Sequence, residues 1–316
     1  MAVHMSKSKP GAGVALKAME LRSVAQPLPG APLDEKGIRW SAVSEATYLI
    51  EQEFRYEYPG PISDLRHRLV IVPRQRHGDQ RRLAHQLDVS PNVPARAAAD
   101  AFGNPVIMVS APVVHESIAF GLRTVLRRRF SADLPPISAA MLREPLLLAP
   151  TRLTRPDAAL LEAAGELRLQ HRDPLELAHA VNAFVHAEMR YDQDSTDVRT
   201  TAAEAFSQRS GVCQDYAHVM LALARSCGIA ARYVSGHLIG EGATHAWVEL
   251  IVPEGSRAVV AALDPTHGRA VTLKYVVVAV GRDYDDVAPT SGSFCGPGGQ
   301  LSSRRRVAVT GIRYAA

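Results

Sequence analysis

The sequence is poor in cysteine, with three in 316 residues, at positions 213, 227 and 295. An odd number cannot pair completely, which argues against a disulfide framework and favours a reducing compartment. The chain has no run of 18 apolar residues, which argues against a membrane-spanning helix. Its first residues also lack the apolar core of a secretory signal. We therefore expect a cytoplasmic protein with no membrane partner.

Recognisable metal signatures are also missing. No spaced acidic residues form a calcium loop, and Asp283, Asp285 and Asp286 fit better as turn residues. Neither CxxC nor HxxxH spacing occurs among the residues that could compete for zinc, which are Cys213, His218, His237 and His245. We therefore expect no metal and no other cofactor.

Charge and composition favour a soluble globular protein. Hydrophobic residues make up 47% and charged residues 22% of the chain, and the net charge is only +4. Arginines gather between residues 66 and 82 and again at 127–129, but no aromatic residues alternate with them for stacking on bases. We favour solvated strand faces over a nucleic-acid site. A protein partner on this region remains the alternative.

The first half of the chain divides into two segments. Residues 1–40 are rich in Pro, Gly, Ser and Lys with little periodicity, which predicts disorder. Residues 41–150 have the rhythm of short strands and turns that is typical of an all-β domain, followed by a connector. The clearest predicted strands of this segment lie at 47–58, 66–73 and 83–89.

Residues 151–316 supply helices first and strands afterwards, which predicts an α+β core with helices packed on an antiparallel sheet. Helix starts are indicated by Thr154–Asp157, by Asp173 followed by Pro174, and by the capping box Thr201–Glu204. Short connecting loops favour antiparallel pairing. The predicted strands of this core lie at 231–239, 244–252, 258–263, 274–280 and 306–312.

One predicted helix, from Ser210 to Gly228, is apolar on most sides and should be buried. Ser210 is the expected N-cap, and Gly228 can take the left-handed turn at the end. Cys213 lies in the first turn, where unpaired N–H groups and the helix dipole favour a thiolate. Taken alone, the helix favours an inert core residue, which is what most single cysteines are.

Two later residues favour a catalytic interpretation. His245 begins an alternating strand 32 residues after Cys213, and Asp264 ends an apolar run 19 residues after His245. Adjacent antiparallel strands would place this histidine and aspartate side by side. A nucleophile, a base and an orienting carboxylate then form a triad.

Five motifs together resemble the bacterial branch of the transglutaminase-like superfamily that carries an N-terminal β domain. They are GVCQDYAH (211–218), ARYVSG (231–236), HAWVE (245–249), DPT (264–266) and GRDYDDVAP (281–289). The resemblance implies a cysteine-protease-like core. This chain departs from the family in having Arg257–Ala262 where Gly-Trp is usual and His267 where Asn is usual, so the departures affect substrate contacts near Asp264.

The catalytic residues are thus predicted to be Cys213, His245 and Asp264. The thiolate would attack a carboxamide or peptide carbonyl, and the imidazolium would protonate the leaving amine. We favour a cysteine peptidase or amidase acting on a peptide or protein substrate. A cross-linking glutamine acyltransferase remains open, because both reactions share the acylation step, as does a non-catalytic scaffold that keeps the fold.

Other residues near the motifs have less specific expectations. The backbone N–H of Cys213 is a sensible oxyanion donor, with Gln214 or Gln208 as a second donor, although a solvated side chain is the simpler account of either glutamine. Structural roles are expected for Asp215, His218 and Trp247, a surface position for Glu249, an inert site for Cys227 and an exposed one for Cys295.

Overall fold

The computed structural model describes residues 22–23 and 31–315. Most of the segment 1–40 for which disorder is predicted lies outside the described residues, at 1–21 and 24–30. The end of that segment is ordered, because Glu35–Gly37 forms a 3-10 turn in which the Asp34 side chain accepts a hydrogen bond from the N–H of Lys36. The predicted disordered segment is therefore too long at its C-terminal end.

The region 41–150 contributes most of a module of two antiparallel sheets, as its alternating pattern predicts. One sheet has the order β1-β5-β8-β2-β18, with β4 added to β5, and the other has the order β17-β3-β7-β6. Phe54, Leu65 and Phe120 belong to the apolar core between the sheets. The strands are β1 Arg22–Ser23, β2 Val43–Glu57, β3 Ile62–Leu69, β4 Arg76–His77, β5 Gln80–Ser90, β6 Ala95–Ala99, β7 Pro105–Val114, β8 Ser117–Arg129, β17 Thr290–Cys295 and β18 Gln300–Tyr314.

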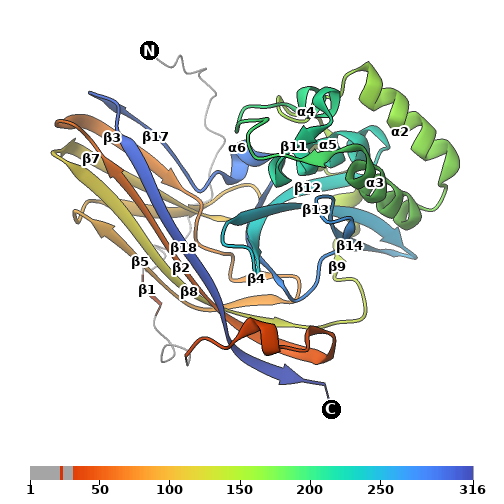
Figure 1. The fold of residues 1–316 in the computed structure, drawn as a ribbon, viewed down its shortest axis with the longest axis horizontal. Helices are drawn as coiled ribbons and strands as arrows, with labels where there is room; N and C mark the ends of the chain where they lie inside the picture. Colours follow the sequence, from red (N-terminus) through yellow and green to blue (C-terminus); the bar gives the residue numbers. More distant parts are fainter. Residues whose placement is uncertain (1–21, 24–30, 316) are drawn as a thin grey trace.

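The last two strands correct an expectation. The strand predicted at 306–312 was assigned to the core sheet, but β18 pairs antiparallel with β2, with Val307 opposite Ile50. The preceding strand β17 pairs with β3 of the second sheet. Figure 1 shows β18, in blue, running alongside β2 across the whole module. The chain therefore returns to its first module after completing the core.

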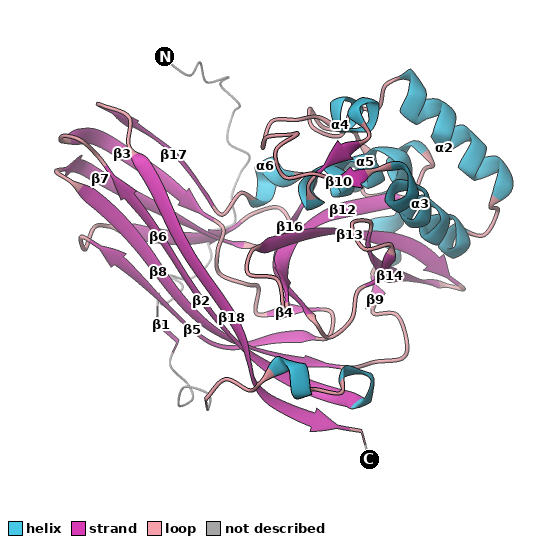
Figure 2. Cartoon of the chain, viewed as in Figure 1, coloured by secondary structure: helices cyan, strands magenta, loops and turns pink. Residues whose placement is uncertain are grey.

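The longer helices lie together on one side of the core sheet (Figure 2), whereas Leu147 in a short helix packs with Ile251 on the other side. The predicted start signals are confirmed, because Asp157, Asp173 and Thr201 are N-caps whose side chains accept hydrogen bonds from first-turn N–H groups. The helices are α1 Pro145–Leu148, α2 Ala158–Gln170, α3 Pro174–Glu188, α4 Ala202–Gln208, α5 Cys213–Ser226 and α6 Tyr284–Val287, with 3-10 turns at Trp40–Ala42 and Ala139–Arg143. None of the described helices is long and apolar enough to cross a bilayer.

The core sheet is antiparallel with the order β15-β14-β13-β12-β16, and β9 pairs with β14. The central helix α5 packs on β12 and β13, so that Val219 and Leu223 share one apolar core with Val248. The strands are β9 Pro136–Ile137, β12 Ala230–Leu238, β13 Thr244–Glu254, β14 Arg257–Asp264, β15 Arg269–Ala270 and β16 Tyr275–Gly281, and a separate parallel pair is formed by β10 Arg190–Tyr191 and β11 Ser210–Gly211.

The start of α5 differs from the prediction in its cap. Val212, and not Ser210, is the N-cap, and its N–H donates to Oδ2 of Asp215 at 2.8 Å. Thr196 donates to the same oxygen at 2.6 Å. The structural role expected for Asp215 is thereby confirmed: this buried carboxylate closes the helix start next to Cys213. At the other end, Gly228 takes the predicted left-handed turn, with φ of +83°.

A buried ion cluster joins the core sheet to the β module. Glu249 on β13 is 5% exposed, which corrects the surface position expected for it. Its carboxylate accepts from Arg232 at 2.6 Å and from His77 of strand β4 at 2.7 Å. Burial would raise the pKa of Glu249, but these two partners hold it well below its usual value.

Candidate active site

The structure brings the three predicted catalytic residues to one place. Cys213 is the first residue of α5, His245 lies near the start of β13, and Asp264 ends the neighbouring strand β14. His245 Nε2 and Asp264 Oδ2 are 2.8 Å apart. Cys213 and His245 both line a cleft of about 450 Å³. The expectation that the histidine and aspartate lie side by side on adjacent strands agrees with this geometry.

The charge on His245 follows from its partners. Burial would lower the pKa of this imidazole, but hydrogen bonds with Asp264 and Cys213 outweigh it and raise the pKa to about 10. These partners therefore favour the protonated ring. Because Nε2 is engaged by the carboxylate, the thiol can interact only with Nδ1, which also lies 3.5 Å from a carboxylate oxygen of Glu241.

Asp264 is buried and anionic. Burial would raise its pKa, but hydrogen bonds from His245, Tyr275 and His267 hold that pKa well below its usual range. Oδ2 accepts from all three side chains at 2.7–2.8 Å, and Oδ1 accepts from the N–H of Thr266 at 2.9 Å. The carboxylate is thus fixed in one orientation and cannot rotate away from His245.

A second histidine and a glutamate complete a ring of contacts that the sequence analysis did not find. His267 Nε2 lies 3.1 Å from Oε1 of Glu241, whose other oxygen lies 3.5 Å from His245 Nδ1. Asp264, His245, Glu241 and His267 therefore form a closed cycle of alternating carboxylates and imidazoles. The only signal in the sequence was the unusual His267, three residues after Asp264.

The oxyanion side of the site is built by the start of α5. The first N–H groups of a helix have no partner within the helix, so that of Cys213 is available to a developing oxyanion. Gln214 lines the cleft, and its buried side-chain nitrogen has no partner among the described residues. The solvated position expected for Gln214 is therefore wrong. Gln208 is exposed and does not line this cleft.

The other residues for which the sequence predicts no catalytic role lie where that prediction puts them. His218 is buried, burial lowers its pKa to about 3, and its Nε2 accepts from the N–H of Tyr284 at 3.2 Å. Cys227 is buried, and burial raises the pKa of its thiol to about 11. Cys295 is exposed, and Trp247 is fully buried. The structural expectations for these four residues agree with their positions.

A metal could be held only at the site itself within the described part of the chain. Donor atoms of His245, Asp264 and His267 lie within 4.8 Å of one another. Both imidazoles already donate to the aspartate, so a metal ion would have to displace two protons. The expectation that the protein needs no metal stays a prediction.

The second wall of the cleft comes from the β module. Phe54 and Tyr56 on β2 and Leu301 and Arg305 on β18 line the same cleft as Cys213. The hydroxyls of Tyr56 and Thr290 lie 2.6 Å apart, which ties β2 to β17 at the rim. The site is therefore assembled from both modules.

Comparison with known proteins agrees with this architecture. Residues 162–264 match the family described as the transglutaminase-like superfamily. Residues 48–126 match the bacterial transglutaminase-like N-terminal region. The fold falls into a cysteine-protease-like class. Within it, the chain carries a transglutaminase-like core preceded by the bacterial N-terminal region.

Individual relatives add detail. An uncharacterized Mycobacterium leprae protein is 35% identical over 162 residues, covering 48% of this chain and 56% of the relative. An uncharacterized Mycobacterium tuberculosis protein is 27% identical over 278 residues, covering 78% and 86% of the two chains. The crystal structure named "a Putative Cysteine Protease" from Cytophaga hutchinsonii is 19% identical with a TM-score of 0.70, over 86% of this chain and 93% of that one. At this identity, the likeness shows the fold alone.

Proposed function

We propose that the protein is a thiol enzyme that hydrolyses peptide or amide bonds through an acyl-enzyme. One observation carries the proposal: the thiol at the start of α5 shares a cleft with an imidazole that is hydrogen-bonded to a buried, fixed carboxylate. Nucleophile, proton donor and orienting group are the three parts that such chemistry requires.

Each step can be assigned to a residue. The Cys213 thiolate attacks the carbonyl carbon, forming a C–S bond, while the helix-start N–H groups receive the oxyanion. The C–N bond then breaks, and the imidazolium of His245 gives its proton to the departing amine. In the second half, water attacks the thioester, His245 takes a proton from that water, and Cys213 leaves again as thiolate. Asp264 orients the ring throughout.

An amine in place of water would receive the acyl group of a glutamine side chain, giving a cross-link where that amine belongs to a protein, through the same first half. Hydrolysis is our proposal because the cleft supplies His245 as a base for water, and no second feature of the described residues favours an amine.

The test is to trap the acyl-enzyme. The protein is incubated with a pool of glutamine-containing peptides, quenched in acid and analysed by intact mass and by mapping of Cys213. We expect a peptide acyl adduct on this cysteine. Water should discharge the adduct faster than the added amine, glycine methyl ester at millimolar concentration, does. If the amine discharges most of the adduct, the proposed reaction is acyl transfer and not hydrolysis.

The control variants separate an enzyme from a scaffold. Cys213→Ala should lose all adduct, whereas Cys295→Ser should keep it, because Cys295 is exposed and outside the cleft. Two results would favour the non-catalytic scaffold. One is unchanged peptide turnover in Cys213→Ala. The other is the absence of an adduct with any peptide, combined with peptide binding that does not depend on the thiol.

A further inference from the structure

The lining of the cleft carries permanent charge of one sign only. Its described lining contains no aspartate or glutamate, and Arg305 is the only lining side chain with a permanent charge. The rest of the wall beside Cys213 and His245 is mostly aromatic or polar and neutral. Its aromatic members are Phe54, Tyr56, Tyr191, Tyr233 and Tyr284.

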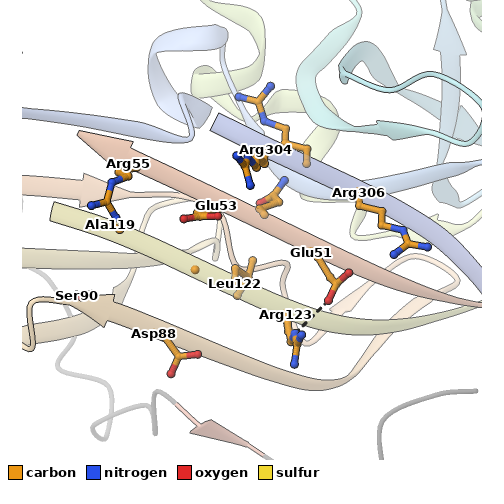
Figure 3. Close-up of a pocket in the computed structure, with 13 residues that line it drawn as sticks. Glu51, Glu53, Arg55, Asp88, Ser90, Ala119, Leu122, Arg123, Arg304 and Arg306 are labelled. Carbon is orange, nitrogen blue, oxygen red and sulfur yellow. Dashed lines mark hydrogen bonds and ion pairs between the residues drawn. The ribbon is translucent and has the colours of Figure 1, made fainter. Parts of the chain in front are cut away.

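Arg305 reaches the cleft because strand β18 alternates. Arg304 and Arg306 are exposed and lie opposite Glu53 and Glu51 in the β2–β18 register. These four residues line a second hollow on the outer face of the sheet, together with Gln52 and Arg305, and acidic side chains lie close by there (Figure 3). The residue between the two exposed arginines is half-buried, and its guanidinium carbon lies 5.3 Å from the centre of the Phe54 ring.

This guanidinium has lost part of its water without gaining an anion. Its Nε is buried and has no hydrogen-bond partner, and it forms no ion pair with any residue in the described ranges. Burial lowers the pKa of Arg305 from its usual value. A desolvated cation without a partner is costly. A carboxylate from outside the chain could relieve that cost, because the planar guanidinium binds carboxylates through paired hydrogen bonds.

We propose that Arg305 receives a carboxylate of the substrate, so that the enzyme selects peptides with an acidic residue close to the bond it attacks. The proposal rests on the proposed function and deepens it. It also gives the β module a role, since β18 carries the selecting side chain into a cleft whose nucleophile lies on the core helix α5. Aspartate and glutamate side chains and a free peptide carboxyl terminus share this chemistry.

Binding is measured separately from catalysis, in the Cys213→Ala background. Fluorescein-labelled hexapeptides of Gly and Ala carry one Glu, Gln or Lys at each position in turn, with the carboxyl terminus free or amidated, and affinity is read by polarisation. We expect the best Glu peptide to bind about 10- to 100-fold more tightly than its Gln counterpart, the range for a hydrogen bond between charged groups. Preference for the free terminus instead of Glu identifies the terminal carboxylate as the source.

Variants assign the effect to one residue. Arg305→Met, which keeps much of the apolar stem, should abolish the preference for Glu over Gln, and Arg305→Lys should restore part of it. Arg304→Met on the outer face is the matched control and should keep the full preference. The proposal is overturned if Glu and Gln peptides bind with equal affinity at every position and a free terminus is not preferred. Failure of both kinds of peptide to bind counts as the same result. A preference that survives in Arg305→Met also overturns the proposal.

The outcomes separate the two proposals. If wild-type enzyme forms an acyl adduct with neutral and acidic peptides equally, and Arg305→Met changes nothing, the acidic specificity is wrong and the thiol chemistry stands. If acidic peptides bind through Arg305 but Cys213 never forms an adduct, the carboxylate site stands and the enzymatic function is wrong.

Discussion

His267 donates a hydrogen bond from Nδ1 to Oδ2 of Asp264 at 2.7 Å, and the same oxygen accepts a hydrogen bond from Nε2 of His245 at 2.8 Å. One buried carboxylate oxygen thus serves two imidazoles. Only His245 lines the cleft with Cys213. The two histidines should therefore differ sharply in their effect on catalysis.

Replacing the carboxylate tests the base. In Asp264→Asn, we expect kcat to fall by about 10³- to 10⁴-fold, the loss seen when a triad aspartate is replaced in a serine protease. The alkaline limb of the pH–rate profile should also move. The carboxylate raises the pKa of His245, and the mechanism needs the protonated ring, so removing the carboxylate lowers that pKa and shifts the alkaline limb to lower pH. An unmoved limb would contradict the assigned proton donor.

His267→Ala removes one donor to the same oxygen and leaves those of His245 and Tyr275. We expect kcat to fall by about 10-fold or less, because one hydrogen bond contributes about 1 kcal/mol and Asp264 stays buried and charged. In His267→Asn, whose side chain can still donate a hydrogen bond, kcat should fall less. Kinetics of both variants beside Asp264→Asn measure this order. A loss in His267→Ala equal to that in Asp264→Asn would make His267 a catalytic partner.

The cap of the central helix can be tested by stability. Asp215→Ala removes the acceptor for the N–H of Val212, the residue before Cys213, and for the Thr196 hydroxyl. We expect unfolding free energy to fall by about 2–3 kcal/mol, from the lost cap and the unsatisfied buried donors. Urea denaturation followed by circular dichroism measures it. Asp215→Asn retains an acceptor oxygen, so its unfolding free energy should fall less. An equal fall in both variants would show that the charge of Asp215, and not its hydrogen bonds, stabilises the helix start.

Glu249 offers a separate test of the contact between the modules. Glu249→Gln leaves Arg232 buried without its anion, and we expect a loss of about 3–5 kcal/mol. The pKa of Glu249 is lower in the folded chain than in the unfolded one. Its contribution is therefore present above the unfolded pKa of about 4.3 and is lost as pH falls below it. Chemical denaturation from pH 7 down to pH 3 should show wild type and Glu249→Gln converging; a constant gap contradicts the ion cluster.

Local chemistry predicted the helices well, because each start is set by residues close in sequence. Asp157, Asp173 and Thr201 accept hydrogen bonds from N–H groups two or three residues away. The cap of α5 was missed because the carboxylate that closes it lies inside the helix at Asp215 and reaches back to Val212. Ser210, which looked like the cap, lies in the short strand β11 instead.

Long-range pairing was harder to predict. The alternating pattern of β18 fits either sheet equally, and its partner β2 lies more than two hundred residues earlier in the chain. The order of Cys213, His245 and Asp264 was enough to propose a site, and their catalytic roles stay predictions. Tyr275 and Glu241 were missed because they reach the site only through the position of β16 and of the turn before β13.

The most direct test of the account is the alkylation rate of Cys213 at pH 6, with Cys295 of the same molecule as the internal reference. Iodoacetamide labelling is followed over time by peptide mapping, in wild type and in His245→Ala. If the thiolate is held by the imidazolium, Cys213 reacts at least about 10-fold faster than exposed Cys295, and His245→Ala removes that advantage. Equal or slower labelling of Cys213, or an advantage that survives without His245, would contradict the thiol enzyme.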